Sequence, residues 1–321
     1  MTLGIAVLGT GRIVETGYVP AFAEVGDARL VAILSRDQAR SDAFAKKHDI
    51  PAAYADLDAL LADPAVDAVI VATPDLTHEA QVIAAAKAGK HILCEKPMAI
   101  DPAACARMAD AVGASGVTFA MGYDNRFNAG LRRIKEMIDA GEVGPVLYAH
   151  TLLTTAVSDP NNWRAAGEQS RYWAMSASGT HVIDIYRWYF GEPEKAGGAF
   201  ISPVYNSKKD EISTVILNYS GRLMASLTVA SVLPEGNRIE IHGEKGSIVG
   251  TKVFGRKNPQ AFLTVKGREF AVDQRDPFID EIEDFVAAIR TGRPPLSGLE
   301  DGVRNVAIMQ RAWEADSLRP I

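Results

Sequence analysis

The chain is poor in cysteine, and its histidines are few and scattered. The 321 residues include two cysteines, Cys94 and Cys105, which belong to no disulfide or metal-binding pattern. The six histidines include no pair at the spacing of metal ligands. These absences argue against a metal site and a disulfide framework, and they are typical of a protein of the reducing cytoplasm.

Long apolar runs and an excess of positive charge are missing as well. No apolar stretch approaches the roughly 18 residues of a transmembrane helix, and the start at Met1 lacks the pattern of a signal peptide. The net charge of -6 argues against nucleic acid or an anionic membrane as a partner. The remaining composition, 47% hydrophobic and 23% charged, is ordinary for a globular protein, and the length favours two domains.

Short apolar runs alternate with helical stretches through the first 122 residues. Continuous apolar runs are typical of strands covered on both faces, as in a parallel sheet. The predicted strands cover residues 3–9, 28–35, 66–73, 90–95 and 117–123. Helices are predicted at 37–48, at 75–87 and after the cap formed by Asp101 and Pro102. This alternation predicts a doubly wound α/β domain over residues 1–122.

The pattern changes in the second predicted domain, residues 123–321. Strands follow one another in series with turn signals between them, which predicts a mostly antiparallel sheet. These strands are expected at 146–155, 195–204, 211–219, 223–232, 237–242, 247–253 and 261–265. Helices are expected at 129–140, 177–189, 276–290 and 299–315, and residues 158–171 form a predicted polar loop.

The segment GTGRIV, residues 9–14, follows the first predicted strand and opens a predicted helix. In dinucleotide-binding domains, glycines allow a tight turn and a close approach to a pyrophosphate, and the helix N-terminus attracts this anion. The third glycine of the pattern is Val14 here, and an ordinary strand–helix turn is the alternative. The position at the first strand favours nucleotide binding by Gly9, Thr10, Gly11, Arg12 and Ile13.

The end of the second strand bears on the choice of cofactor. NAD enzymes typically place a carboxylate there for the ribose hydroxyls, whereas this chain has Ser35 followed by Arg36. A hydroxyl and a guanidinium suit a 2′-phosphate, so NADP is favoured over NAD, and Arg36 can also stack on adenine. The alternative is a solvated helix start, which Asp37 and Arg40 serve equally well.

Two further turns follow predicted strands. After the third strand, Thr73, Pro74 and His78 are expected to contact the cofactor, with His78 facing the cleft where strand ends converge; an exposed helix histidine is the alternative. After the fourth, Lys96 stands between Glu95 and Pro97, and the proline prevents the strand from continuing. Lys96 is then either an incidental surface lysine or an ammonium delivered to that cleft.

The segments GTGRI, ATPDLTH, CEKPMA and NRF, in this order and spacing, resemble the glucose-fructose oxidoreductase / inositol dehydrogenase family of NAD(P)-dependent oxidoreductases. The resemblance covers nearly the whole chain. It implies a Rossmann domain, then an α/β domain with an open sheet, and a sugar or polyol substrate bound between them. It also implies a homodimer or homotetramer formed through that sheet.

The same resemblance suggests catalytic roles. Lys96 would reach the nicotinamide ribose and the substrate hydroxyl, with a cis peptide bond before Pro97, and His181 matches a catalytic histidine. The family's aspartate four residues earlier is Ala177 here. We therefore expect His181 to lack carboxylate support and to act as a neutral hydrogen-bond donor, with Lys96 as the main acid/base. Asp184 is either a partner of His181 or a structural residue.

Further contacts follow from matching positions. Cofactor contacts are expected from Glu95, Lys96, Arg126, Trp163 and Arg164, and substrate contacts from Lys96, Tyr123, Asp124, Tyr172 and His181. The expected function is hydride transfer between a nicotinamide and a secondary alcohol or carbonyl of a sugar, inositol or related polyol. Alternatives are a dinucleotide-binding regulator that has lost catalysis, and a reductase of a dihydrodiol or tetrapyrrole.

Overall fold

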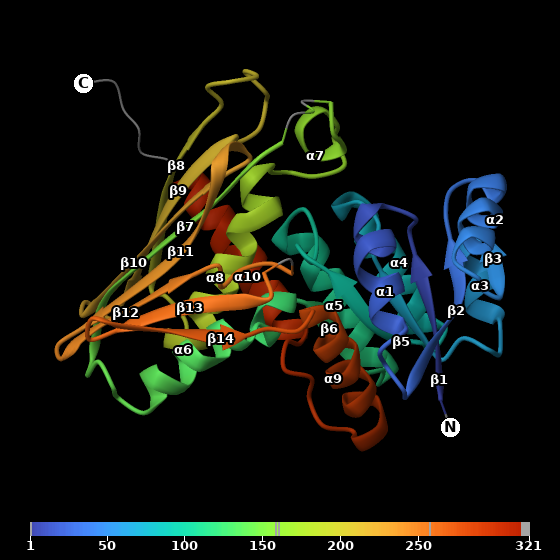
Figure 1. Cartoon of the computed structure of the whole chain (residues 1–321). Coiled ribbons are helices and arrows are strands. Elements are labelled where there is room, and N and C mark those ends of the chain that lie inside the picture. The colour runs from blue at the N-terminus through green and yellow to red at the C-terminus, as the bar shows by residue number, and fades with distance from the viewer. Residues whose placement is uncertain (1, 158, 160, 257, 316–321) are drawn as a thin grey trace. The chain divides into compact units, whose positions relative to one another are not determined.

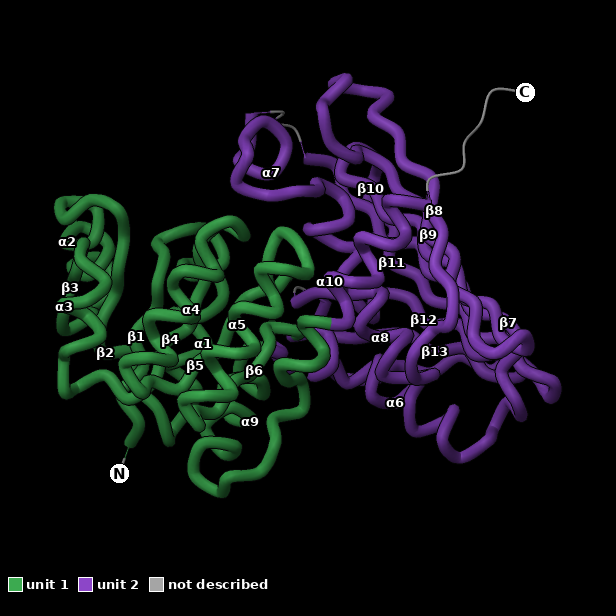
Figure 2. Tube along the Cα trace, turned by 180° about the vertical axis from the view of Figure 1, so that it is seen from behind, with its two compact units in different colours: residues 1–123, 278–303 green, residues 124–277, 304–321 purple. Residues whose placement is uncertain are grey.

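The computed structural model describes residues 2–157, 159, 161–256 and 258–315. The chain divides into two compact units (Figure 2): unit 1 contains residues 1–123 and 278–303, and unit 2 contains residues 124–277 and 304–321. Within the described ranges, no helix is both long and apolar enough to cross a membrane.

Unit 1 is built on a parallel sheet of six strands (Figure 1). The strands are β1 (Leu3–Leu8), β2 (Ala28–Leu34), β3 (Ala52–Tyr54), β4 (Ala68–Val71), β5 (His91–Glu95) and β6 (Phe119–Gly122). Their order is β3-β2-β1-β4-β5-β6, and every pairing is parallel. This is the strand order of a doubly wound dinucleotide-binding fold, so the predicted fold class is confirmed.

Helices connect these strands, and several begin at the expected caps. They are η1 (Val14–Tyr18), α1 (Val19–Phe22), α2 (Gln38–Lys47), α3 (Leu57–Ala62), η2 (Asp75–Thr77), α4 (His78–Lys87) and α5 (Pro102–Ser115). The carboxylates of Asp37 and Asp101 accept backbone N–H groups at the starts of α2 and α5, and Pro102 is the first residue of α5. Short β3 and α3 were not predicted, because three half-buried strand residues give no clear apolar run.

The helix α9 (Pro277–Thr291) brings a distant segment back to unit 1. Its residues Phe278, Ile282 and Phe285 are buried in the same core as Val7 and Ile33 of the parallel sheet. The sequence pattern placed this segment with the second domain, since its position in the chain carries no sign of what it packs against. The hydrophobic face of α9 therefore adds residues 278–303 to the first compact unit.

Unit 2 is built on a sheet of eight strands in the order β14-β13-β12-β11-β7-β10-β9-β8. The strands are β7 (Val146–Ala156), β8 (Lys195–Ile201), β9 (Ile212–Tyr219), β10 (Leu223–Ala230), β11 (Val232–Gly243), β12 (Gly246–Thr251), β13 (Gln260–Val265) and β14 (Arg268–Asp273). All pairings are antiparallel except β7 with β10. The mostly antiparallel sheet is confirmed; β14 was missed because most of its residues are exposed.

One face of this sheet is covered by helices. The helical segments are η3 (Asp124–Phe127), α6 (Ala129–Asp139), α7 (Trp163–Ala166), η4 (Met175–Gly179), α8 (Thr180–Phe190) and α10 (Leu299–Glu314). Residues of α6, α8 and the end of α10 share one core with inward residues of the strands, such as Val215, Leu227 and Ile239. The short α7 lies in the predicted polar loop, of which residues 158 and 160 are outside the described part of the chain.

A buried carboxylate holds the start of the helical segment that carries His181. Asp210, in the connection before β9, is 1% exposed. It accepts the backbone N–H groups of Trp173 at 2.8 Å and Met175 at 2.7 Å, and the Ser213 hydroxyl at 2.6 Å. Burial raises the pKa of Asp210, and these hydrogen bonds act in the opposite direction. The segment 173–190 is thereby tied to β9.

We expect Asp210→Asn to destabilise the protein by about 2 kcal/mol, because an amide cannot accept all of these buried donors. Denaturant unfolding measures this change. Asp139→Asn is the control, since Asp139 is exposed and pairs with Lys135 one turn away within α6, and we expect a change below about 0.5 kcal/mol there. Equal stabilities of the two variants would show that Asp210 does not hold the helix start.

Candidate functional site

The turns that follow β1, β2, β4 and β5 meet at one edge of the unit 1 sheet. The guanidinium of Arg40, after β2, donates from Nε to Thr10 Oγ1, after β1, at 2.7 Å. A Cβ atom on Gly9 would lie 2.5 Å from the carbonyl oxygen of Ala72, after β4. The parallel order brings the carboxyl ends of these strands together, and this edge is where such folds bind ligands.

The turn after β1 has the backbone of a dinucleotide-binding turn. Gly9 has a φ of 120°, which, with the close approach to Ala72, leaves no room for a side chain. A Cβ on Gly11 would meet no atom of the described chain within 4 Å, so this side of the turn is open. The helical stretch begins at Arg12, and its first turn presents backbone N–H groups. The predicted residues Thr10, Arg12 and Ile13 lie in this turn.

The residues after β2 differ in how accessible their side chains are to a ligand. Ser35 is 8% exposed; its N–H donates to Ser41 Oγ and its hydroxyl donates to the carbonyl oxygen of Asp37. The Asp37 carboxylate caps α2 by accepting the Arg40 N–H at 2.8 Å. Arg36 and Arg40 are both exposed. The sequence pattern predicts Arg40 only as part of a helix start, although its position four residues after Arg36 is a signal for a second basic group.

His78 does not have the position expected of a cofactor ligand. Its side chain is fully buried, Nε2 lies 2.9 Å from the carbonyl oxygen of Thr73, and Nδ1 lies 3.1 Å from that of Pro97. The imidazole therefore connects the turn after β4 to the turn after β5. Thr73 and Pro74 are partly exposed in the first of these turns, and the Thr73 hydroxyl donates to Gln81 at 2.6 Å.

The turn that carries Lys96 is held by a buried carboxylate. The Lys96–Pro97 peptide bond is cis, and the Lys96 N–H donates to Glu95 Oε2 at 3.2 Å. The hydroxyl of Tyr18 lies 2.9 Å from Glu95 Oε1 and 3.3 Å from Glu281 Oε2 of α9. Glu95, predicted as a cofactor contact, is 8% exposed and serves to fix the backbone of Lys96. Tyr18 and Glu281 were not found from the sequence, since only packing brings them to Glu95.

In unit 2, His181 has a carboxylate neighbour. Nδ1 of His181 lies 3.5 Å from Oδ1 of Asp124, and both side chains are nearly buried, at 12% and 11% exposure. The alanine at position 177 removes the family's aspartate, but a carboxylate from another element lies beside His181. Asp124, predicted to bind substrate, belongs to η3 and comes from a different element than α8, which carries His181.

Asp184 is a structural partner of Arg126. Arg126 donates from Nε and Nη2 to the two carboxylate oxygens of Asp184 at 2.8 and 2.7 Å, and both side chains are almost completely buried. Asn305 Nδ2 also donates to Asp184 at 3.1 Å. Arg126, predicted as a cofactor contact, thus joins η3 to α8, and the suggestion that Asp184 faces His181 is not supported.

The other predicted side chains are dispersed. The Arg164 guanidinium lies over the Trp163 ring, 4.0 Å from its centroid, and both residues are partly exposed in α7. Tyr172 is buried against Trp313 in the unit 2 core, and burial raises its pKa to about 12, so it is a core residue in place of a substrate ligand. Tyr123 is also fully buried.

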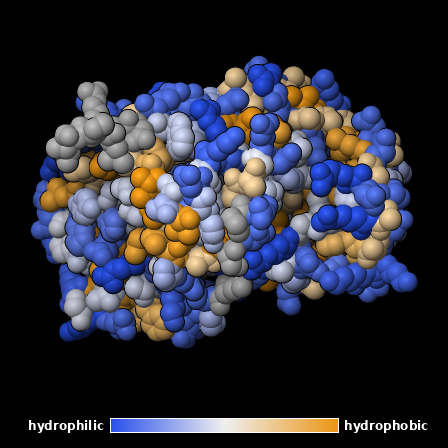
Figure 3. All heavy atoms as spheres, turned by 90° about the horizontal axis from the view of Figure 1, so that it is seen from above, coloured by the Kyte–Doolittle hydropathy of each residue, from blue (hydrophilic) through white to orange (hydrophobic). Residues whose placement is uncertain are grey.

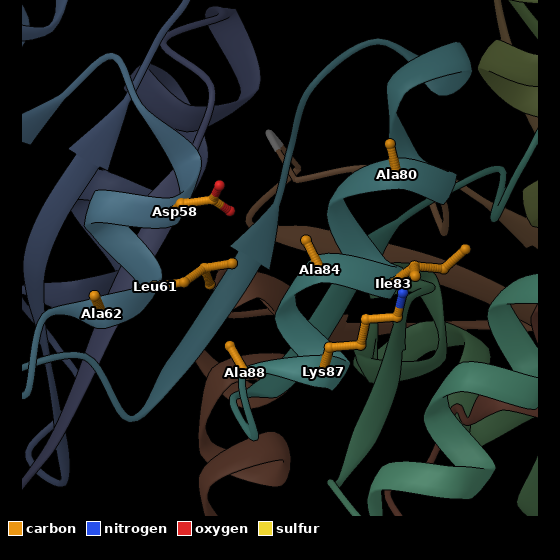
Figure 4. A pocket seen from close by; sticks show the side chains of 8 residues that line it. All are labelled: Asp58, Leu61, Ala62, Ala80, Ile83, Ala84, Lys87 and Ala88. Atoms are coloured by element: carbon orange, nitrogen blue, oxygen red, sulfur yellow. The ribbon is translucent and has the colours of Figure 1, made fainter.

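One surface pocket, of about 550 Å³, lies along α3 and α4 of unit 1 (Figure 4). It is lined by Asp58, Leu61, Ala62, Ala80, Ile83, Ala84, Lys87 and Ala88. Its wall is mostly small aliphatic side chains, and none of the predicted site residues belongs to it. The candidate functional residues are therefore those in the turns at the strand ends of unit 1 and those around His181 in unit 2.

A parallel sheet of this order with a glycine turn after β1 defines a dinucleotide-binding domain. Two family models match the chain: "Oxidoreductase family, NAD-binding Rossmann fold" over residues 3–123 and "Oxidoreductase family, C-terminal alpha/beta domain" over residues 135–319. The chain belongs to this oxidoreductase family, that of glucose-fructose oxidoreductase and inositol dehydrogenase, and it is an enzyme of the NAD(P)-dependent dehydrogenase class.

Named relatives are similar over nine tenths or more of their length. Myo-inositol 2-dehydrogenase of Thermotoga maritima is 29% identical over 93% of this chain and 91% of its own. D-xylose 1-dehydrogenase (NADP(+)) 2 of Haloferax volcanii is 26% identical over 96% of both chains. The structure of aldose-aldose oxidoreductase from Caulobacter crescentus, complexed with glycerol, superposes with a TM-score of 0.91, with 25% identity, over 98% of this chain and 97% of that chain.

Proposed function

We propose that this protein transfers a hydride between NADP and a secondary alcohol or carbonyl of a sugar, inositol or related polyol. The observation that carries the proposal is the joint arrangement at the carboxyl edge of the unit 1 sheet. There, a glycine turn follows β1, two exposed arginines follow β2, and the fixed backbone of Lys96 follows β5. The names of the relatives support the substrate class, since they include an inositol, a xylose and an aldose enzyme.

The residues present fit a dinucleotide. The open side of the turn at Gly11 leaves room for a pyrophosphate beside the first helical turn, whose N–H groups and dipole attract an anion. Arg12 adds an exposed positive charge in the same turn. A bound nicotinamide supplies hydride acceptance in the oxidative direction and hydride donation in the reductive one.

The side chains of the protein accept or donate the proton of the substrate hydroxyl. When a carbinol is oxidised, its hydroxyl proton must pass to a positioned basic group. We assign this role to Lys96, whose backbone is fixed by Glu95 and by His78 through Pro97, and to His181. The catalytically lapsed alternative gains no support from the loss of the aspartate at position 177, because His181 retains a carboxylate neighbour.

The preference for NADP is supported by the residues after β2. The one carboxylate in that turn, Asp37, is engaged as the cap of α2, and two exposed guanidiniums lie on either side of it. Arg40 also contacts Thr10 of the glycine turn, so its charge lies beside the predicted cofactor turn. Ser35 contributes less than expected, since its hydroxyl is bound to the backbone of Asp37.

We also propose self-association through the outer face of the unit 2 sheet, the face opposite to the helices. Three neighbouring strands place exposed apolar residues there: Tyr148 of β7, Ile216 of β9 and Met224 of β10. Seen from above (Figure 3), the surface carries several groups of hydrophobic residues among hydrophilic ones. The apolar row on the sheet therefore suits a second copy of the chain, as the family resemblance implies.

The first test is turnover. Purified protein should oxidise members of a panel of sugars and inositols with NADP, and Lys96→Ala should lower the turnover by about 10²- to 10⁴-fold while cofactor binding survives. Lys87→Ala, an exposed lysine of α4, is the control with unchanged turnover. Cofactor binding without turnover of any member would favour the regulator, and full activity of Lys96→Ala would remove the lysine from the mechanism.

The second test is cofactor affinity, measured by quenching of tryptophan fluorescence. We expect Arg36→Ala and Arg40→Ala each to weaken NADPH binding by about 10- to 100-fold, the loss of one charge-assisted contact, with little effect on NADH. Arg29→Ala serves as control, because Arg29 is exposed near the opposite end of β2. Tighter binding of NADH than of NADPH by the wild type would refute the preference.

The third test is the oligomeric state. Light scattering should give a dimer or tetramer for the wild type and a monomer for the double variant Ile216→Glu/Met224→Glu, since burying two carboxylates in an interface is costly. The control is Leu76→Glu, which changes an exposed apolar residue of unit 1. A monomeric wild type at micromolar concentration would overturn the proposal.

A further inference from the structure

We propose that Asp124 is the positioning residue of His181. Its carboxylate holds the imidazole at Nδ1, so that Nε2 is the ring nitrogen that exchanges a proton with the substrate hydroxyl. The inference rests on the proposed function, in which His181 takes part in proton transfer, and it assigns to η3 a role that the sequence pattern places at position 177.

The geometry supports a pairing through one specific nitrogen. Asp124 Oδ1 faces His181 Nδ1 at 3.5 Å, and little of either side chain is exposed; at this distance the contact is an ion pair and not a hydrogen bond. A carboxylate at this nitrogen favours the tautomer with the proton on Nδ1, and it stabilises the imidazolium that forms when Nε2 takes up a second proton. A carboxylate orients the histidine of serine hydrolases in the same way.

The contacts of Asp184 and Asn125 favour Asp124 as the carboxylate that positions His181. The other carboxylate near in sequence, Asp184, is bound by Arg126 and Asn305. The amide of Asn125 donates to Asp124 Oδ1 at 3.4 Å. Because that amide is uncharged, it helps to orient the carboxylate without neutralising it.

Position 177 provides a compensating variant. Ala177 precedes His181 by four residues and lies in the π-helical turn η4, which leads directly into α8, so the two residues are about one helical turn apart. A carboxylate placed there by Ala177→Asp can approach the same imidazole. If Asp124 acts only by positioning His181, Ala177→Asp should restore the tautomer of His181 and the kcat that are lost in Asp124→Ala.

The first experiment needs no substrate. Two-dimensional ¹H–¹⁵N spectra of the histidine side chains report which ring nitrogen carries the proton, and His181→Asn assigns the signal. We expect the Nδ1-protonated form in the wild type, a shift toward the Nε2-protonated form in Asp124→Ala, and a return in Asp124→Ala/Ala177→Asp. The same tautomer in all three proteins would overturn the proposal.

The second experiment uses the sugar or inositol found in the turnover panel. Asp124→Ala should lower kcat by about 10- to 100-fold, less than the roughly 10²- to 10⁴-fold cost of losing a proton-transfer group itself, and change KM by less than about threefold. Ala177→Asp in that background should recover most of kcat, whereas Asp139→Ala, an exposed control, should change neither constant. An increase in KM at unchanged kcat would make Asp124 a substrate ligand and overturn the positioning role.

Unfolding and a failed assay are both distinguishable from failure of the proposal. Melting temperatures identify a destabilised variant, and Asp124→Asn, of nearly the same size, then takes the place of the alanine variant in both experiments. If the wild type turns over no member of the panel, the proposed function fails. The tautomer spectra still decide whether Asp124 positions His181.

Discussion

The parallel pairing of β1 with β2 on one side and β4 on the other is the constraint on which the unit 1 site depends. Because these strands run in the same direction, the turns that follow them reach the same edge. The pairing also brings the backbone of Ala72 against Gly9, where only a glycine fits. A shift of one residue in either register would separate the glycine turn from its neighbours and turn every strand side chain to the opposite face.

Three buried polar side chains serve to position other parts of the chain. His78 joins two backbone turns, Glu95 holds the Lys96 backbone, and Asp210 holds the start of the segment before His181. Each of these groups is hydrogen-bonded, as burial requires, because an unsatisfied polar group would cost about 1–3 kcal/mol. The exposed cations Arg36 and Arg40, in contrast, remain at the surface, where an anionic ligand can approach them.

The fold could be predicted from the sequence, whereas most contacts of individual side chains could not. Continuous apolar runs identified five of the six parallel strands, and serial strands with turn signals identified the second sheet. These signals missed β3 and β14, whose residues are half-buried or exposed and show no apolar run. The order of elements along the chain also placed α9 in the second predicted domain, although the apolar face of that helix packs into the unit 1 core.

The amino-acid order by itself determined which turns carry the candidate functional residues, because a glycine turn, a Lys-Pro turn and a strand-end arginine are local patterns with local causes. Pairings between distant residues were decided by the tertiary structure. Tyr18 reaches Glu281 across 263 positions, and Arg126 reaches Asp184 across 58. The alanine at position 177 suggested a missing carboxylate, yet Asp124 of another element supplies one. A side chain's chemistry is local, but its neighbours depend on packing between elements, which no short stretch of sequence encodes.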